Sequence, residues 1–247
     1  MLPASDHFIR IYKSQAAAYH ELVAAEDADG NLLPALLAIA PLANARVLDL
    51  GSGSGRVPLL LKDLNCEIVA VDLHHAMLIE QAQQMSLRAK RTQAKLGSNL
   101  PHLVQADLRR LPLVVGWADV TVAGWAIGHF TGWYAGWQAQ AERALAEMHR
   151  ATKAGGTLII LETLGTGVQE AAAPNVALAA YYHWLEREQG FSRRVVATDY
   201  DFGSLPRAVE LCGFFFGEPL AARVKANGWQ RVPEWTGGWS RINTPVP

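Results

Sequence analysis

The residues best suited to chemistry in this sequence are glycines and carboxylates placed where buried strands would end. The stretch 47–56, VLDLGSGSGR, is typical of a buried strand that runs into a glycine-rich turn, with Asp49 inside the strand. Glycine tolerates positive φ and lets a ligand approach the backbone closely, and a helix beginning there offers unpaired N–H groups to polar ligand atoms. Asp72 lies 21 residues beyond Gly51 and ends the next apolar run, EIVAVD. A carboxylate at that place can accept hydrogen bonds from both hydroxyls of a ribose, so the pattern predicts a nucleoside-binding site.

A parallel sheet is needed to bring these residues together. Apolar runs that predict strands alternate with segments of helical periodicity, which is typical of right-handed βαβ crossovers. Ligands of such sheets bind beyond the carboxyl ends of the strands, so we expect Asp49, Asp72, Asp107 and Gly124 to share one site. The predicted strands are 46–50, 67–72, 103–106, 117–124 and 157–161, and the predicted helices between them are 57–63, 76–95 and 138–152, the last ended by the turn at 155–156.

The two ends of the chain follow a less regular pattern. One or two amphipathic helices are expected between residues 6 and 28, with a short helix at 32–40. After Glu162 the alternation weakens. There we expect a helix at 171–189, a strand at 193–202, helices at 205–216 and 219–227, and a last strand at 235–242. No linker separates a second domain, so residues 1–247 are predicted to form one domain.

Composition limits the classes of partner. The formal net charge is −1 and 18% of the residues are charged, so nothing favours a nucleic-acid or anionic-membrane partner. Cys66 and Cys212 lie far apart among apolar residues, which predicts buried free thiols in a reducing compartment. Neither a membrane-spanning run nor a signal-peptide pattern is present, so a cytoplasmic protein is expected.

The glycine turn also fits a nicotinamide-binding fold, but two features argue against one. The third glycine of a G-x-G-x-x-G pattern would fall on Arg56, and Asp49 takes a place that dinucleotide folds fill with an apolar residue. The chain instead resembles the class I S-adenosylmethionine-dependent methyltransferases. The matching segments are VLDLGSGSGR, VAVDLHHAML, QADLRRLPL, ADVTVAGWAIGHF and ALAEMHRATKAGGTLIILE, which occur in the family's order between about Tyr19 and Glu162.

The resemblance implies a fold and a division of the chain. The fold class is α/β, a Rossmann-like, seven-stranded, mostly parallel sheet with one antiparallel strand, helices on both faces and a helical cap. Residues 1–40 would form an N-terminal helical cap, 41–162 the cofactor-binding core, 163–192 a cap insertion, and 193–247 the C-terminal strands and helices.

The resemblance also implies S-adenosylmethionine as the cofactor and gives its contacts. The glycine loop would pass under the methionine part, Asp49 would contact its amino group, often through water, and Asp72 would hold the ribose. Met77 would pack on adenine, while Tyr19 would close over the site. The implied cofactor-binding residues are Tyr19, Asp49, Gly51, Ser52, Gly53, Gly55, Asp72, Leu73, Met77, Ala106, Asp107, Leu108, Gly124, Trp125 and Ala126.

The acceptor side is less defined. His129 follows the fourth predicted strand and is the best candidate for a general base, although a helix-capping or packing role fits it somewhat better. Aromatic residues just beyond that strand could wall an aromatic or cationic acceptor pocket, or pack the helix that follows; they are Trp125, Trp133, Tyr134 and Trp137. At least one side chain of the run 181–184 is expected to point into the crevice. His74 and His75 lack the partners of a metal site, so no metal is expected.

The leading hypothesis is a methyltransferase that uses S-adenosylmethionine and acts on an O or N atom of a small molecule. The segment after the fourth strand, AGWA, lacks the asparagine-proline motif of many nucleic-acid and protein N-methyltransferases. A noncatalytic, S-adenosylmethionine-binding regulatory protein is the alternative, and a nicotinamide-dependent oxidoreductase is a weaker one. Nucleic-acid and membrane partners are not expected. The acceptor, the choice of monomer or homodimer, and the use of a base stay open.

Overall fold

A seven-stranded sheet forms the centre of the computed structural model, which describes residues 5–92 and 100–244. Its strand order is β3-β2-β1-β4-β5-β9-β6. β9 runs antiparallel to both of its neighbours, and the remaining pairs are parallel. The predicted mostly parallel sheet with one antiparallel strand is therefore confirmed. The strands are β1 Arg46–Leu50, β2 Glu67–Asp72, β3 His102–Gln105, β4 Ala118–Gly124, β5 Thr152–Thr166, β6 Ser192–Ala197 and β9 Glu234–Ile242.

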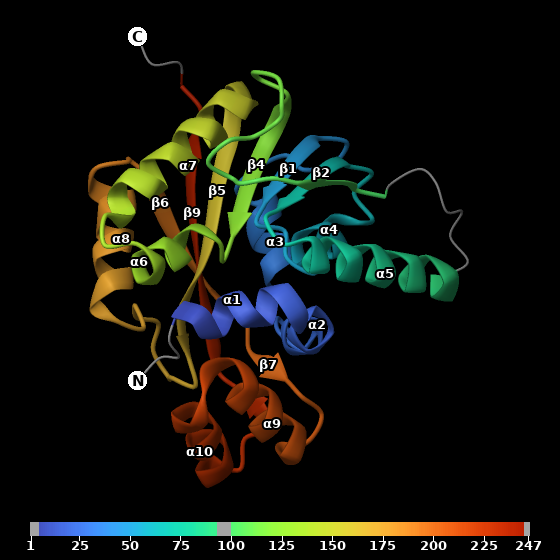
Figure 1. The fold of residues 1–247 in the computed structure, drawn as a ribbon, viewed down its shortest axis with the longest axis vertical. Coiled ribbons are helices and arrows are strands. Elements are labelled where there is room, and N and C mark those ends of the chain that lie inside the picture. Colours follow the sequence, from blue (N-terminus) through green and yellow to red (C-terminus); the bar gives the residue numbers. More distant parts are fainter. Residues whose placement is uncertain (1–4, 93–99, 245–247) are drawn as a thin grey trace.

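Strand residues alternate between two hydrophobic layers, because successive side chains point to opposite faces of a sheet. On β1, Leu48 and Leu50 belong to the layer that also holds α7 and α8, whereas Val47 belongs to the layer of α3 and α4. Helices thus cover both faces (Figure 1). Their bounds are α3 Leu32–Leu37, α4 Arg56–Leu61, α7 Trp137–Ala151 and α8 Val176–Arg187.

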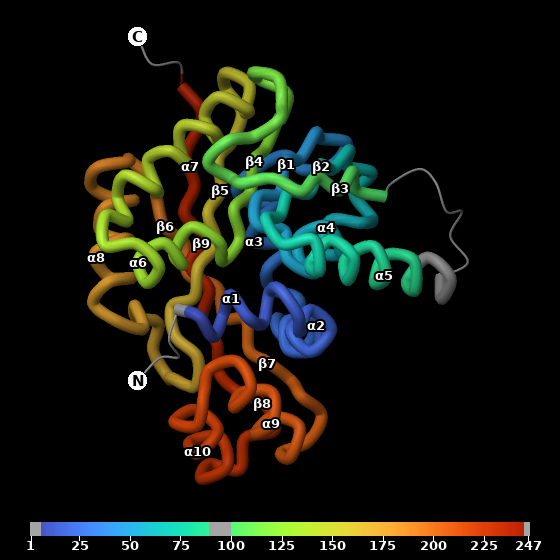
Figure 2. The backbone as a smooth tube through the Cα atoms, in the orientation of Figure 1, coloured from blue at the N-terminus to red at the C-terminus, as the bar shows by residue number. Residues whose placement is uncertain are grey.

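Helices also lie across the carboxyl ends of the strands, at the lower edge of the sheet in Figure 1. The chain's first two helices and its last two meet there although they are far apart in sequence, as the tube in Figure 2 makes plain. A two-stranded sheet, β7 with β8, joins the last two to the main sheet. These elements, with those that border the same edge, are α1 Ser5–Ser14, α2 Ala16–Ala24, α5 His75–Thr92, η1 Ile127–His129, α6 Phe130–Trp133, β7 Tyr200–Asp201, β8 Arg231–Val232, α9 Leu205–Phe216 and α10 Glu218–Asn227.

Two local predictions were wrong. The strand expected at 193–202 is two strands, because the backbone N–H of Thr198 donates to the carbonyl of Glu234 and the chain then leaves the main sheet for β7. The turn at 155–156 does not end the preceding helix, which stops at Ala151. Those glycines lie within β5, where a Cβ on Gly156 would come 2.7 Å from the carbonyl oxygen of Asp119. The end expected for the helix 76–95 lies outside the described residues.

The segment 163–192 was expected to form a cap over the site, but it packs on the sheet. Its helix α8 packs against the sheet and α6, and none of its residues lines the cavity described below. Tyr181, Tyr182 and Trp184 are buried in that layer, and His183 is exposed. The expectation that one of them points into the crevice was therefore wrong, because helical spacing turns the three aromatic rings toward the sheet.

Candidate active site

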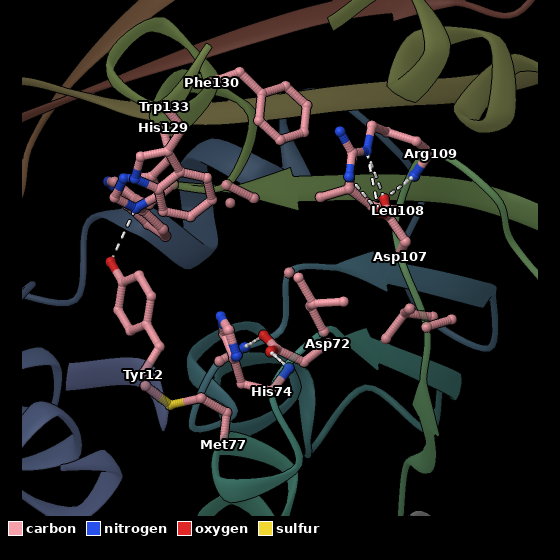
Figure 3. Close-up of a pocket in the computed structure, with 18 of the residues that line it drawn as sticks. Tyr12, Asp72, His74, Met77, Asp107, Leu108, Arg109, His129, Phe130 and Trp133 are labelled. Carbon is pink, nitrogen blue, oxygen red and sulfur yellow. Dashed lines mark hydrogen bonds and ion pairs between the residues drawn. The ribbon is translucent and has the colours of Figure 1, made fainter. Parts of the chain in front are cut away.

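A cavity of about 100 Å³ lies where the carboxyl ends of β1, β2 and β4 meet the N-terminal helices (Figure 3). Most of the residues predicted from the sequence line it. They are Tyr19, Gly51, Gly53, Asp72, Leu73, Met77, Ala106, Asp107, Leu108, Gly124, Trp125, Ala126 and His129. Three do not line it, namely Asp49, Ser52 and Gly55. Residues that sequence reasoning did not assign to the site also line it, among them Tyr12, His74, Arg109 and Phe130.

The glycine loop has the conformation that its sequence predicts. Gly51, Gly53 and Gly55 have φ values of +68°, +54° and +94°, a region that side chains with a Cβ rarely adopt. A Cβ on Gly51 would come 2.5 Å from the Cβ of Ala126, so the two loops can meet only if residue 51 is glycine. Ser52 faces inward, where its hydroxyl donates to Gln81 Oε1 at 3.0 Å. The loop therefore leaves bare backbone on its cavity side.

Asp49 is a buried carboxyl group without a counter-charge. It lies under the loop, and its Oδ2 has no hydrogen-bond partner among the described residues. Burial, aided by the nearby Asp72 carboxylate, raises the pKa of Asp49 to about 8. A buried polar atom of this kind needs a partner to offset its desolvation. A ligand amino group, directly or through water, would supply one.

Asp72 ends β2 and faces the cavity. Its Oδ1 accepts the backbone N–H of His74 at 2.7 Å, and its Oδ2 accepts that of Gly53 at 2.9 Å. Burial raises the pKa of Asp72, and these two hydrogen bonds oppose that rise. Each carboxylate oxygen has a further lone pair, so both can still accept a ligand hydroxyl, as the ribose role requires.

Asp107 is tied to a residue that the sequence reasoning passed over. The Arg109 guanidinium donates to both of its carboxylate oxygens, and the Arg109 backbone N–H donates to Oδ1 at 2.8 Å. This pairing lowers the pKa of Asp107. Arg109 also lies 5.5 Å from the Phe130 ring and 5.3 Å from the Tyr134 ring, within cation–π reach. The arginine in the QADLRR segment, two residues after the acid, was the signal available for it.

His129 lies in an aromatic wall opposite the glycine loop. The Tyr12 hydroxyl and His129 Nε2 are 2.9 Å apart and hydrogen-bonded, and the Trp133 ring stacks on the imidazole at 4.9 Å with a 7° tilt (Figure 3). Tyr19 meets Tyr12 edge to face at 5.3 Å. Burial lowers the pKa of His129 to about 4, so the imidazole is uncharged at neutral pH. Nothing in the local sequence marked Tyr12, because only the packing of α1 brings it to His129.

The four aromatic residues after β4 divide between site and core. Trp133 and Tyr134 line the cavity. Trp137 packs edge to face on Tyr181 and Trp184 in the core. Trp125 lines the cavity, but the Arg56 guanidinium stacks over its ring, 3.5 Å from the ring centroid. Arg56 is in turn paired with the buried Glu26 at 2.6 Å, so this tryptophan supports the loop's far side.

Neither a metal site nor a membrane-spanning helix is found in 5–92 and 100–244. No cluster of three or more histidine, cysteine, aspartate or glutamate side chains there could hold a metal ion. No helix among these residues is both long and apolar enough to cross a bilayer. Cys66 and Cys212 are buried free thiols, as predicted.

Comparison with known proteins agrees with this geometry. Residues 48–160 match the family described as "Methyltransferase domain". The sheet around these residues has the Rossmann-like fold of the class I methyltransferases, whose cofactor is S-adenosylmethionine. The unpartnered Asp49 carboxyl, the bare glycine loop and the Asp72 carboxylate fit that cofactor.

The chain is also similar to a curated protein of Enterobacter lignolyticus, named malonyl-[acyl-carrier protein] O-methyltransferase. The two are 33% identical over 114 residues, which is 46% of this chain and 37% of that protein, so the match spans well under half of the relative. Among solved structures, a methyltransferase from Aquifex aeolicus that depends on S-adenosylmethionine has a TM-score of 0.53 at 13% identity, covering 98% of this chain and all of that one. The [4+2]-cyclase SpnF has a TM-score of 0.54 at 18% identity, covering 87% and 81%. At these identities the structures share the fold alone.

Proposed function

We propose that the protein is an S-adenosylmethionine-dependent methyltransferase that transfers a methyl group to an O or N atom of a small molecule. The observation that carries the proposal is one cavity bounded by the bare glycine loop and by Asp72, above a buried Asp49 that lacks a counter-charge, within a chain that holds a methyltransferase domain. The relative's name describes O-methylation of a malonyl group on a carrier protein, which supports an oxygen acceptor.

We assign the cofactor's parts to the two sides of the cavity. Asp49 would neutralise its amino group, and both Asp72 oxygens would accept its ribose hydroxyls. Met77 and Leu108 would contact the adenine faces, while Tyr19 would cover the methionine end from α2. The remaining residues assigned to cofactor binding are Gly51, Ser52, Gly53, Gly55, Leu73, Ala106, Asp107, Gly124, Trp125 and Ala126, of which Ser52 and Gly55 act through loop shape.

When bound, the sulfonium supplies an electrophilic methyl group and a very good leaving group. The protein's task is then mainly to hold the acceptor atom in line with that methyl group. Tyr12, His129 and Trp133 form the wall of the cavity on this side. His129 is uncharged, so its imidazole can take up the proton that an O–H or N–H acceptor loses. The positive charge then passes from the sulfonium to the imidazole.

Two measurements test the proposal. Titration calorimetry should detect S-adenosylhomocysteine binding and no NAD binding. Asp72→Asn should weaken that binding, while Asp63→Asn, whose side chain is 83% exposed, should not. Tight NAD binding without S-adenosylhomocysteine binding would refute the assignment. Release of S-adenosylhomocysteine from S-adenosylmethionine in the presence of candidate acceptors then tests transfer itself.

A noncatalytic S-adenosylmethionine-binding protein is the second candidate. It is favoured by the pKa of His129, about 4, because a general base works best with a pKa near the operating pH. Turnover with any acceptor would exclude it. Cofactor binding without turnover across carboxylate, hydroxyl and amine acceptors would favour it.

A further inference from the structure

A groove of about 650 Å³ opens beside the cavity, between α1, the start of α5 and α6. It shares four lining residues with the cavity, namely Leu73, His74, Trp133 and Tyr134, so the two spaces adjoin. Of the residues assigned to the cofactor above, Leu73 alone also lines the groove.

The floor of the groove is apolar and open to solvent. Leu73 is 50% exposed, Ile79 47% and Tyr134 36%, and Ile9 and Ala76 complete the apolar lining. Large exposed hydrophobic side chains gathered along one groove indicate a binding surface, whereas scattered ones are ordinary. The floor therefore suits a hydrocarbon chain.

The ionisable groups of the groove favour an anion. Lys13 and two imidazoles, His74 and His75, line it, and no carboxylate does among the described residues. Lys13 is exposed and makes no hydrogen bond or ion pair within 5–92 and 100–244. Its charge acts on His74, whose pKa is lowered by burial and further by Lys13, against the opposing effect of Asp72.

Asp72 opposes Lys13 at His74, but no carboxylate among the described residues lines the groove itself. Asp72 is nine-tenths buried and accepts two backbone N–H groups on its cavity side. Glu80, on α5, is buried and accepts from Gln84. The first turn of α5, which begins at His75, adds the partial positive charge of a helix N-terminus to the same end of the groove.

We propose that this groove binds the non-reacting part of the methyl acceptor, and that this part is an alkyl or acyl chain ending in a phosphate group. The inference rests on the proposed function. Trp133 is the common wall, because it stacks on His129 and also lines the groove. A chain lying along it has its phosphate beside Lys13 and His75, which line the groove and not the cavity, and its other end passes Trp133 toward His129.

The test uses octyl phosphate, below its micelle concentration, with the full chain saturated with S-adenosylhomocysteine. Calorimetry should show binding of octyl phosphate, tighter than octanoate and tighter than octylammonium. Lys13→Glu should weaken it about fivefold or more, because a partner charge is reversed, and Lys225→Glu, on the distant α10, should change it less than about twofold. In nuclear magnetic resonance titrations, bound octyl phosphate should raise the pKa of His74, since an anion favours the charged imidazole.

The outcomes separate the two proposals. Competition between octyl phosphate and S-adenosylhomocysteine would place the probe in the cavity and overturn the groove assignment. Absence of binding, or equal binding by wild type and Lys13→Glu, would also overturn it while leaving the proposed function intact. Octanoate binding more tightly would overturn the choice of phosphate. A chain that binds no S-adenosylhomocysteine would refute the proposed function instead. Ile79→Glu, an exposed change that puts a carboxylate in the groove, should weaken octyl phosphate and leave cofactor binding unchanged.

Discussion

Asp49→Asn should remove a defined part of the pH dependence of stability. In the folded protein the pKa of Asp49 is about 8, whereas an aspartate in an unfolded chain titrates near about 3.9. Between these values the folded state keeps a proton that the unfolded state has released. Stability therefore falls as pH rises, by about 1.4 kcal/mol per pH unit from this group, and levels off above about pH 8. Asparagine carries no such proton.

Urea unfolding of wild type and Asp49→Asn, followed by tryptophan fluorescence from pH 5 to pH 9, measures this effect. The free energy of unfolding of wild type relative to the variant should fall by up to about 4 kcal/mol between pH 5 and pH 8. Glu162 and Glu234, whose pKa values burial also raises to about 8, are present in both proteins and cancel in the difference. The free energy of unfolding of Asp63→Asn should depend on pH in the same way as that of wild type. If the pH dependence of Asp49→Asn were also parallel to that of wild type, the conclusion that the Asp49 carboxyl is buried without a compensating charge would be refuted.

A bound ligand should reduce the pH dependence that Asp49 contributes. If the amino group of S-adenosylhomocysteine lies beside Asp49, its charge lowers the pKa of that carboxyl, because an opposite charge favours the ionised form. Saturation with S-adenosylhomocysteine should then flatten the slope that separates wild type from Asp49→Asn. An unchanged slope in the bound protein would place the amino group elsewhere.

Three further changes test single contacts. Asp72→Asn should weaken S-adenosylhomocysteine by about 1.5–3 kcal/mol, the range for hydrogen bonds to a charged group, in calorimetry; unchanged affinity would remove its ribose role. Tyr12→Phe should raise the pKa of His129 while leaving it below the usual 6.5, because the lost O–H donor favoured the neutral ring but burial persists; a nuclear magnetic resonance titration reports it, and a fall would mean that Tyr12 is the acceptor. Glu162→Ala should cost about 1–3 kcal/mol in urea unfolding, because the Gly128 N–H that donates to Glu162 at 2.7 Å loses its buried partner, and Glu162→Gln should recover most of that loss.

Local patterns were enough for the core of the fold. β1 and β2 have the predicted bounds, because a buried parallel strand is a short apolar run with sharp ends. The bare backbone of the glycine loop was also predictable, since positive φ at Gly51 and Gly53 is a local property. The irregular C-terminal part was harder. The strand expected at 193–202 is divided by hydrogen bonds of Thr198 with Glu234 and Thr236, which lie far along the chain.

The site residues also divide into those that the sequence predicted and those that only the tertiary structure placed. The sequence by itself determined the residues at or just after strand ends, such as Asp72 and Asp107, because the carboxyl ends of parallel strands lie at one edge of the sheet. Tertiary structure alone decided which aromatic side chains face the cavity. Helical periodicity cannot tell whether a ring packs on the sheet, as Trp137 does, or on the site, as Trp133 does. It also decided the pairing of Tyr12 with His129 across 117 positions, and the groove that Lys13 borders, because both depend on where α1 docks.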